Sequence, residues 1–181
     1  MRIISGTLRG REIKGYTIDG TRPTMDRVKE SMFAIIQDYI KDSVCLDLFS
    51  GTGNLGIEAI SNGAKKCYFN DKNKIAVKVI KDNIKKFEIE DKCDVINKDY
   101  LDALDYYKEN HIKFNIVFLD PPYENKVITE IFKMLYRKRL LKKNAIVVCE
   151  YTCEDLQNDY FDVIKSKNYG YKKVGIYTQK K

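Results

Sequence analysis

The sequence predicts an α/β fold built on a doubly wound, Rossmann-like parallel sheet, and three observations support this prediction. A short apolar run, residues 44–48, is typical of a buried strand. Gly51 and Gly53 then allow a tight turn, after which an amphipathic helical pattern begins at Asn54. Apolar runs and helical patterns alternate along the rest of the chain, whose 181 residues suffice for one such domain with a small appendage.

The expected elements follow from this alternation. The first helix should begin after Pro23, with an apolar stripe from Val28 to Ile40. Further helices are expected over residues 75–87, 101–108 and 127–141, and further strands over residues 66–70, 93–97, 114–119 and 145–150. Residues 161–165 and 175–178 should form a final strand pair that closes one domain, residues 21–181.

The N-terminal residues 1–20 are expected to form a small β-hairpin outside this domain. Two short extended segments, residues 2–5 and 7–14, are separated by Gly6. The segment carries a dense positive charge, from Arg2, Arg9, Arg11 and Lys14. RNA contact is the interpretation that we favour. The alternative is a solvated hairpin whose charges prevent edge-to-edge pairing.

The turn after the first strand is a candidate binding site. Gly51, Gly53 and Gly56 satisfy the G-x-G-x-x-G pattern of dinucleotide sites, which alone is a weak signal. Asp47, four residues before Gly51, would repel a pyrophosphate but would attract an ammonium and a sulfonium group. S-adenosylmethionine carries both cations, so we expect it to bind here. The alternative is an ordinary strand-to-helix turn in which Asp47 caps the helix.

Acidic residues also follow the next two expected strands. Asp71 lies twenty residues after Gly51, the usual distance to an acid that binds both ribose hydroxyls. Asp99 can accept a hydrogen bond from an adenine amino group, and the ring of Tyr100 can lie against the base. Asp99 could equally cap the helix that begins near Leu101.

The fourth strand, residues 114–119, runs directly into Asp120-Pro121-Pro122-Tyr123. Two prolines cannot continue a sheet ladder, so the chain leaves the sheet stiffly at Asp120. If the strand order is 3-2-1-4-5, the first and fourth strands are neighbours. The glycine turn and Asp120 would then share one pocket at the carboxyl ends of the strands.

Such a pocket suits methyl transfer to an exocyclic amine of a nucleobase. The Asp120 carboxylate and the Pro121 carbonyl could accept hydrogen bonds from the amine and free its lone pair. Tyr123 offers a ring on which a base can stack, worth about 1–3 kcal/mol. Positioning would provide most of the acceleration, and the target base would have to be unstacked or flipped outward.

Two arginines at the start of the first helix point to an anionic ligand. Arg22 and Arg27 lie where cations oppose the helix dipole, which suggests a carboxylate or phosphate of a ligand nearby. Two solvated arginines beside an ordinary Thr24 cap are almost as consistent with these residues.

The composition limits the class of protein. The net charge of +7 suits a nucleic-acid partner, although lysine is abundant along the whole chain. There is one histidine and no C-x-x-C pair, so a metal site or disulfide framework is not expected, and reduced thiols in the cytoplasm are the simple interpretation of Cys45, Cys67, Cys93, Cys149 and Cys153. No apolar run approaches the ~20 residues that span a bilayer, and no secretory signal is visible, so we expect no membrane association.

Together these motifs resemble the RsmD family, bacterial methyltransferases that modify guanine N2 in small-subunit ribosomal RNA. The resemblance covers nearly the whole chain, through M-R-I-I-S-G, T-R-P-T-M-D-R-V-K-E-S-M-F, L-D-L-F-S-G-T-G-N-L-G-I-E-A, D-P-P-Y and N-Y-G. Other amino-methylating enzymes share D-P-P-Y, whereas T-R-P-T-x-D-R-V is far more discriminating.

The resemblance implies a class I methyltransferase domain with seven strands, the last antiparallel, and an N-terminal hairpin for RNA. It implies that S-adenosylmethionine is held by Arg22, Thr24, Asp47, Phe49, Ser50, Gly51, Thr52, Gly53, Asn54, Asp71, Asp99 and Tyr100. The implied catalytic residues are Asp120, Pro121, Pro122 and Tyr123, and the expected RNA contacts are Arg2, Arg9, Arg11, Lys14, Arg22 and Arg27. Asp71 stands where glutamate is more frequent, and Asn70 where an apolar residue is more usual.

The expected partner is ribosomal RNA in an assembling small ribosomal subunit, bound by a monomer. A DNA adenine-N6 methyltransferase would share the pocket but usually carries a target-recognition insertion, and none is visible after Asp120. A non-catalytic RNA-binding assembly factor is the third possibility.

Overall fold

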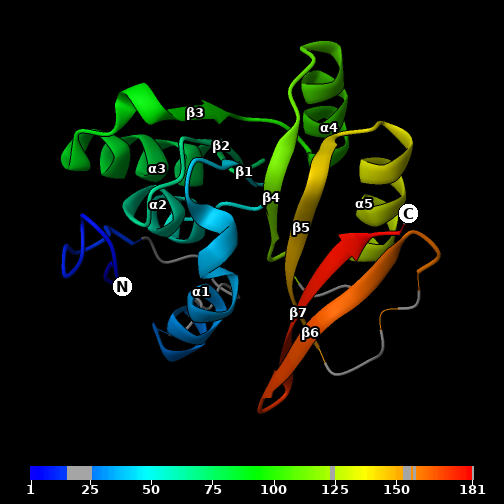
Figure 1. Ribbon diagram of the computed structural model, residues 1–181. Helices are drawn as coiled ribbons and strands as arrows, with labels where there is room; N and C mark the ends of the chain where they lie inside the picture. Colours follow the sequence, from blue (N-terminus) through cyan, green and yellow to red (C-terminus); the bar gives the residue numbers. More distant parts are fainter. Residues whose placement is uncertain (16–25, 123–124, 153–155, 157, 181) are drawn as a thin grey trace.

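The computed structural model describes residues 1–15, 26–122, 125–152, 156 and 158–180. Within these residues the chain forms one seven-stranded sheet with helices on both faces (Figure 1). The helices are α1 (Asp26–Ile40), α2 (Asn54–Ser61), α3 (Lys74–Phe87), α4 (Tyr100–Glu109) and α5 (Asn125–Arg137), with a short 3₁₀ turn at Glu90–Lys92. The strands are β1 (Val44–Asp47), β2 (Lys66–Asn70), β3 (Cys93–Ile96), β4 (Phe114–Leu119), β5 (Leu141–Thr152), β6 (Phe161–Tyr169) and β7 (Lys172–Gln179).

The strand order is β3-β2-β1-β4-β5-β7-β6. The first five of these strands pair in parallel, and β7 is antiparallel to both β5 and β6. The predicted order 3-2-1-4-5 is therefore confirmed, as is the antiparallel strand at the end of the chain. Because β1 and β4 are neighbours, their carboxyl ends lie at the point where the strand order reverses.

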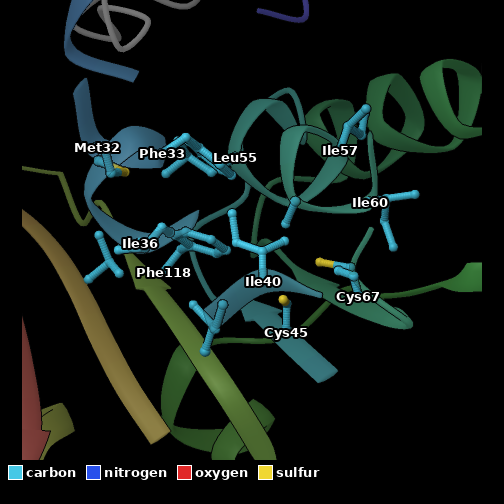
Figure 2. Packing of buried hydrophobic residues seen from close by; sticks show 14 of the residues in the cluster. Met32, Phe33, Ile36, Ile40, Cys45, Leu55, Ile57, Ile60, Cys67 and Phe118 are labelled. Atoms are coloured by element: carbon cyan, nitrogen blue, oxygen red, sulfur yellow. The ribbon is translucent and has the colours of Figure 1, made fainter. Parts of the chain in front are cut away.

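Two apolar clusters fill the space between the sheet and its two helical layers. One joins α1, α2 and α3 to one face of the sheet, and the other joins α4 and α5 to the opposite face. Figure 2 shows the first cluster, where Phe33 of α1 meets Phe118 of β4. Their rings stack with centroids 5.7 Å apart. This contact fixes α1 against the strand that ends at the predicted catalytic motif.

The N-terminal segment, residues 1–15, packs directly on α2 and α3. An isolated antiparallel bridge joins Arg2 to Glu12, so the two expected extended segments, residues 2–5 and 7–14, do pair, although they form no continuous strands. Ile3 and Ile13 are buried in the same cluster as α1 and α2. At Gly6, a Cβ would lie only 1.9 Å from the backbone oxygen of Ser61. Residues 1–15 thus contribute side chains to the main hydrophobic core and do not project from the domain as a separate hairpin.

Two boundaries differ from those expected from the sequence. The helix predicted to reach residue 141 ends at Arg137, because the amide of Leu140 turns back to donate to the Leu135 carbonyl and Arg139 adopts a φ of 53°. Leu141 therefore begins β5. The final strand pair is also longer than predicted and forms an extended hairpin, β6–β7.

The remaining expectations from composition can be compared with the described residues. Four cysteines there are free, and three of them are buried. In the described ranges no group of three or more His, Cys, Asp or Glu side chains is arranged to hold a metal ion. None of the helices described is long and apolar enough to cross a bilayer.

Candidate cofactor and active site

The glycine turn lies between β1 and α2, as predicted. Gly51 and Gly53 have φ angles of 56° and 80°, which side chains other than glycine adopt at a cost. Gly56 lies in the first turn of α2, where a Cβ would approach the Phe69 ring to 2.3 Å and Cys67 Sγ to 2.7 Å. The first two glycines thus shape the loop, and the third lets the helix pack closely on β2.

Asp47 ends β1 beneath this loop, and its side chain is buried. One carboxylate oxygen accepts a hydrogen bond of 3.0 Å from the amide of Gly56. Burial raises the pKa of Asp47 to about 7; the Gly56 hydrogen bond opposes this, and the charges of Asp120 and Asp71 add to it. Asp47 is therefore a buried acid with other acids nearby and a strong electrostatic preference for a cationic ligand.

Asp71 follows β2 and supports the glycine loop. Its Oδ2 accepts from the Gly51 amide at 2.9 Å, and its Oδ1 accepts from the Asn73 amide at 2.8 Å. Each carboxylate oxygen can accept a second hydrogen bond, so the carboxylate can still bind ribose hydroxyls.

The polar residue before Asp71 also has a structural role. The Asn70 side-chain amide donates to the Leu48 carbonyl, and its oxygen accepts from the Lys98 amide, both at 3.2 Å. Asn70 therefore ties together the loops that follow β1 and β3. An apolar residue, which the family resemblance led us to expect there, could not make these bonds.

Asp99 and Tyr100 lie where β3 gives way to α4. Asp99 caps this helix by accepting from the Leu101 amide at 3.1 Å, so the capping interpretation is confirmed. The Tyr100 ring lies 5.7 Å from the ring of Phe49, which follows β1. Its hydroxyl donates to Glu130 Oε2 at 2.7 Å. The residues that follow β1 and β3 thus bring two aromatic rings together.

Asp120 lies at the same edge of the sheet as Asp47. In the β1–β4 pairing, Asp47 stands opposite Phe118, and Asp120 follows two residues later, directly after the end of β4. Phe118 faces the α1 side of the sheet, and the charge of Asp120 acts on Asp47, so the two carboxylates lie near each other at this edge. Pro121 and Pro122 then leave the sheet, as predicted. Tyr123, Arg22 and Thr24 lie outside the described residues.

The donor set fits S-adenosylmethionine better than a dinucleotide. Asp47, Asp71 and Asp120 end three adjacent parallel strands, and the charges of the last two act on the first. A pyrophosphate would be repelled by this cluster, whereas the ammonium and sulfonium groups would be stabilised by it. The cofactor itself would thus be held by Asp47, the glycine loop and Asp71, with the Phe49 and Tyr100 rings near the base.

A buried ionic network beneath the site was not predicted. Lys29 of α1 and Glu58 of α2 have side chains that are 0% exposed and form an ion pair of 2.8 Å. Lys29 Nζ also donates to the Arg2 carbonyl and to Asn54 Oδ1, each at 2.7 Å. Glu58 accepts from the amides of Ile4 and Ser5. The available signal was a charged residue inside the apolar pattern of each helix.

A second buried polar contact links the N-terminal segment to the glycine loop. Asn83 of α3 accepts from the Lys14 amide at 2.9 Å and donates to the Lys14 and Thr52 carbonyls at 3.0 and 3.1 Å. The segment is therefore coupled to the candidate cofactor loop at both of its ends, through Asn83 and through the Lys29 network.

Apart from Arg22, which lies outside the described residues, the basic residues predicted to contact RNA belong to this segment and to α1. Arg2 approaches Asp26 to 3.7 Å, and Lys14 pairs with Asp82 at 2.9 Å. Arg11 donates to the Lys86 carbonyl and lies over the Phe87 ring. Arg9 and Arg27 are exposed. The segment is thus held in place partly by the cations that were expected to bind RNA.

The fold and the acidic edge of the sheet together define a class I methyltransferase, the class that uses S-adenosylmethionine. The particular family follows from comparison with known proteins. A family described as "Conserved hypothetical protein 95" matches residues 1–178, and the chain belongs to this family, the RsmD family.

Named relatives agree with this assignment. Over 151 residues the chain is 38% identical to "Ribosomal RNA small subunit methyltransferase D" of Haemophilus influenzae, covering 83% of this chain and 78% of the relative. It is 30% identical to the Escherichia coli protein of the same name, covering 86% and 76%. It is also 34% identical to YlbH of Bacillus subtilis, a candidate rRNA methyltransferase, covering 99% and 100%.

Solved structures show the same fold. The Escherichia coli protein yhhF, described as a candidate methyltransferase, superposes with a TM-score of 0.85 at 27% identity, covering 99% of this chain and 97% of that one. A Haemophilus influenzae methylase candidate, HI0767, gives a TM-score of 0.79 at 32% identity, covering 97% and 96%. The methyltransferase candidate SMU.776, solved with SAH, gives 0.63 at 16% identity, covering 80% and 48%. This last likeness concerns the fold alone.

Proposed function

We propose that this protein transfers a methyl group from S-adenosylmethionine to the exocyclic N2 of a guanine in small-subunit ribosomal RNA. The observation that carries the proposal is the meeting of two motifs at one sheet edge, where the charge of Asp120 after β4 acts on Asp47 at the end of β1. The names of the relatives in Haemophilus influenzae and Escherichia coli support ribosomal RNA as the substrate.

The proposed chemistry depends on positioning a weak nucleophile. When bound, S-adenosylmethionine supplies an activated methyl carbon with a neutral leaving group. The Asp120 carboxylate and the Pro121 carbonyl accept hydrogen bonds from the guanine amine, which frees its lone pair. Pro122 stiffens the turn that holds both acceptors, and Tyr123 stacks on the base. No strong base is needed, because positioning supplies most of the acceleration, and the methylated, cationic nitrogen would then lose its acidic proton to the Asp120 carboxylate or to water.

The proposed RNA surface runs from the N-terminal segment to the start of α1. Arg9 and Arg27 are exposed and suited to phosphate contacts, and Arg22 belongs to the segment that connects them in the sequence. Arg2, Arg11 and Lys14 would serve RNA binding mainly by holding the segment in place, since each also contacts another part of the chain.

Methyl transfer to defined acceptors tests this function. The purified protein and labelled S-adenosylmethionine are incubated with small ribosomal subunits from a strain that lacks the activity, with protein-free rRNA, or with DNA. Nucleoside mass spectrometry should detect N2-methylguanine from the ribosomal acceptors. Asp120→Ala should retain cofactor binding and lose methyl transfer by on the order of 10²-fold or more. Asp91→Ala, a change at an exposed acid in the 3₁₀ turn, is the matched control.

The outcomes separate the competing functions. N6-methyladenine in DNA would favour a DNA methyltransferase. Failure to bind S-adenosylmethionine in calorimetry would favour a non-catalytic assembly factor. Undiminished transfer by Asp120→Ala would overturn the catalytic role of Asp120. The substrate would still be identified by the mass spectra of the nucleosides.

A further inference from the structure

The turn of the β6–β7 hairpin reaches the catalytic edge of the sheet. β4 pairs with β5 through Leu119 and Cys149, and β5 pairs with β7 through Cys149 and Gly175. The β5–β7 ladder continues to Lys172, opposite Thr152 and three residues past Cys149. At the rise of a β-strand, the three residues from Cys149 to Thr152 extend about 10 Å. Figure 1 shows the hairpin turn projecting beyond the sheet on the side toward which β4 runs.

The hairpin turn is also electrostatically coupled to Asp120. Lys172 forms an ion pair with Glu150 of β5, whose side chain is 4% exposed. Burial lowers the pKa of Lys172, but the hydrogen bond and charge of Glu150 outweigh it, with a further contribution from the charge of Asp120, so that the net pKa is raised. The Lys172 ammonium therefore lies within electrostatic reach of the proposed catalytic carboxylate.

A second contact holds the hairpin against α1. Both the Tyr169 hydroxyl and Lys167 Nζ donate to Ser31 Oγ. The hairpin is thus anchored on one side to β5, next to Asp120, and on the other side to the helix whose first turn carries Arg27. Its position relative to the candidate active site is fixed by both anchors.

The residues of this turn have the chemistry of a surface that binds single-stranded nucleic acid. Residues 163–173 contain four lysines and no acid. Tyr171 is 61% exposed, more than any other tyrosine or phenylalanine in the part of the chain that the structure describes. Gly170, with a φ of 63°, makes the sharp turn that places tyrosines on both sides of it. An exposed ring among cations suits base stacking and phosphate contact.

We propose that the β6–β7 turn, residues 169–173, is a second RNA-contacting element, in which Tyr171 stacks on an unpaired base beside the target guanine. The inference rests on the proposed function for the identity of the polymer. It adds that the RNA next to the target guanine is single-stranded on the side that faces this hairpin. The other lysines of the hairpin contact the phosphates of the same strand, and the Lys172–Glu150 pair positions the turn.

Substitution of Tyr171 tests the stacking contact without touching the ion pair. The probe is a single-stranded RNA of mixed sequence, about 12 nucleotides long, with one 2-aminopurine whose fluorescence is quenched on stacking. Tyr171→Ala should weaken RNA binding by about 5-fold to 100-fold and abolish the quench. Tyr171→Phe keeps the ring and should stay within about 3-fold of the parent protein.

Tyr39→Ala is the matched control. Tyr39 is 40% exposed near the end of α1, next to the amino end of β1 and so away from the catalytic edge. Its loss should change neither RNA binding nor the quench. S-adenosylmethionine affinity, measured by calorimetry, should be unchanged in all three variants, and the KM for ribosomal acceptor should rise in Tyr171→Ala while kcat changes less.

The results distinguish this inference from the proposed function. Equal RNA binding by Tyr171→Ala, Tyr171→Phe and Tyr39→Ala would overturn the hairpin contact even if rRNA is methylated normally. Equal losses in Tyr171→Ala and Tyr171→Phe would also overturn it, because a stacking contact needs only the ring. If the parent protein methylates no rRNA but Tyr171→Ala still loses oligonucleotide binding, the hairpin contact stands and the proposed function fails.

Discussion

Replacing Lys29 by methionine should severely destabilise the protein. Its ammonium has three donors, and the structure assigns each one an acceptor: Glu58 Oε2, Asn54 Oδ1 and the Arg2 carbonyl. Both side chains of the ion pair are 0% exposed, so no water replaces the lost cation at Glu58. Removing one partner of a buried pair costs about 3–5 kcal/mol. This is a large part of the total stability of a domain, about 5–15 kcal/mol.

The free energy of unfolding, measured by urea denaturation, checks this prediction. The double variant Lys29→Met/Glu58→Gln removes both charges but keeps a side-chain oxygen for the backbone amides of the N-terminal segment. It should recover about 1–3 kcal/mol relative to the sum of the single changes. Lys78→Met, at an exposed position of α3, is the control and should change stability by no more than about 0.5 kcal/mol. A loss below about 1 kcal/mol for Lys29→Met, or strict additivity in the double variant, would refute the reasoning.

Three further predictions concern the cofactor loop. S-adenosylmethionine affinity, measured by calorimetry, should increase by up to about tenfold for each unit by which the pH is raised toward 7, and it should level off above pH 7. The reason is that burial and the neighbouring carboxylates raise the pKa of Asp47 to about 7, and the cationic cofactor binds the deprotonated carboxylate. Asp47→Asn should remove this dependence. Gly56→Ala should cost about 1–3 kcal/mol in urea denaturation, since its methyl group would collide with Phe69. Asn83→Ala should cost about 2–3 kcal/mol and speed amide exchange in the N-terminal segment, because Lys14 loses both of its backbone bonds to the Asn83 side chain.

The sequence was sufficient to predict how the first and fourth strands end, and the convergence of the two main motifs followed on the condition that the strand order is 3-2-1-4-5. Both predictions depend on local signals, because the glycine turn and the twin prolines each define how a strand ends. The general rule that ligands bind where strand order reverses then brings the turns together. The adjacency of β1 and β4 places the point of reversal between the strands that carry the two motifs.

The polar network beneath the site could not be predicted in the same way. Lys29 and Glu58 are 29 positions apart in the sequence, and their pairing depends on how α1 and α2 pack on the same face of the sheet. A charge within an apolar stripe signals only that some partner must exist. Similarly, the exposed residues of β6 gave no apolar alternation, so the length of the hairpin was underestimated.

Helix α1 connects the two proposed RNA-contacting elements to the catalytic strand. Lys29 holds the N-terminal segment through the Arg2 carbonyl, and two residues later Ser31 holds the β6–β7 hairpin. Two residues further on, Phe33 stacks on Phe118 of β4. A single rigid helix therefore sets the position of both elements relative to Asp120. An RNA strand that contacts both would meet elements whose relative position is already set, and its affinity should depend on α1 packing even where α1 itself makes no RNA contact.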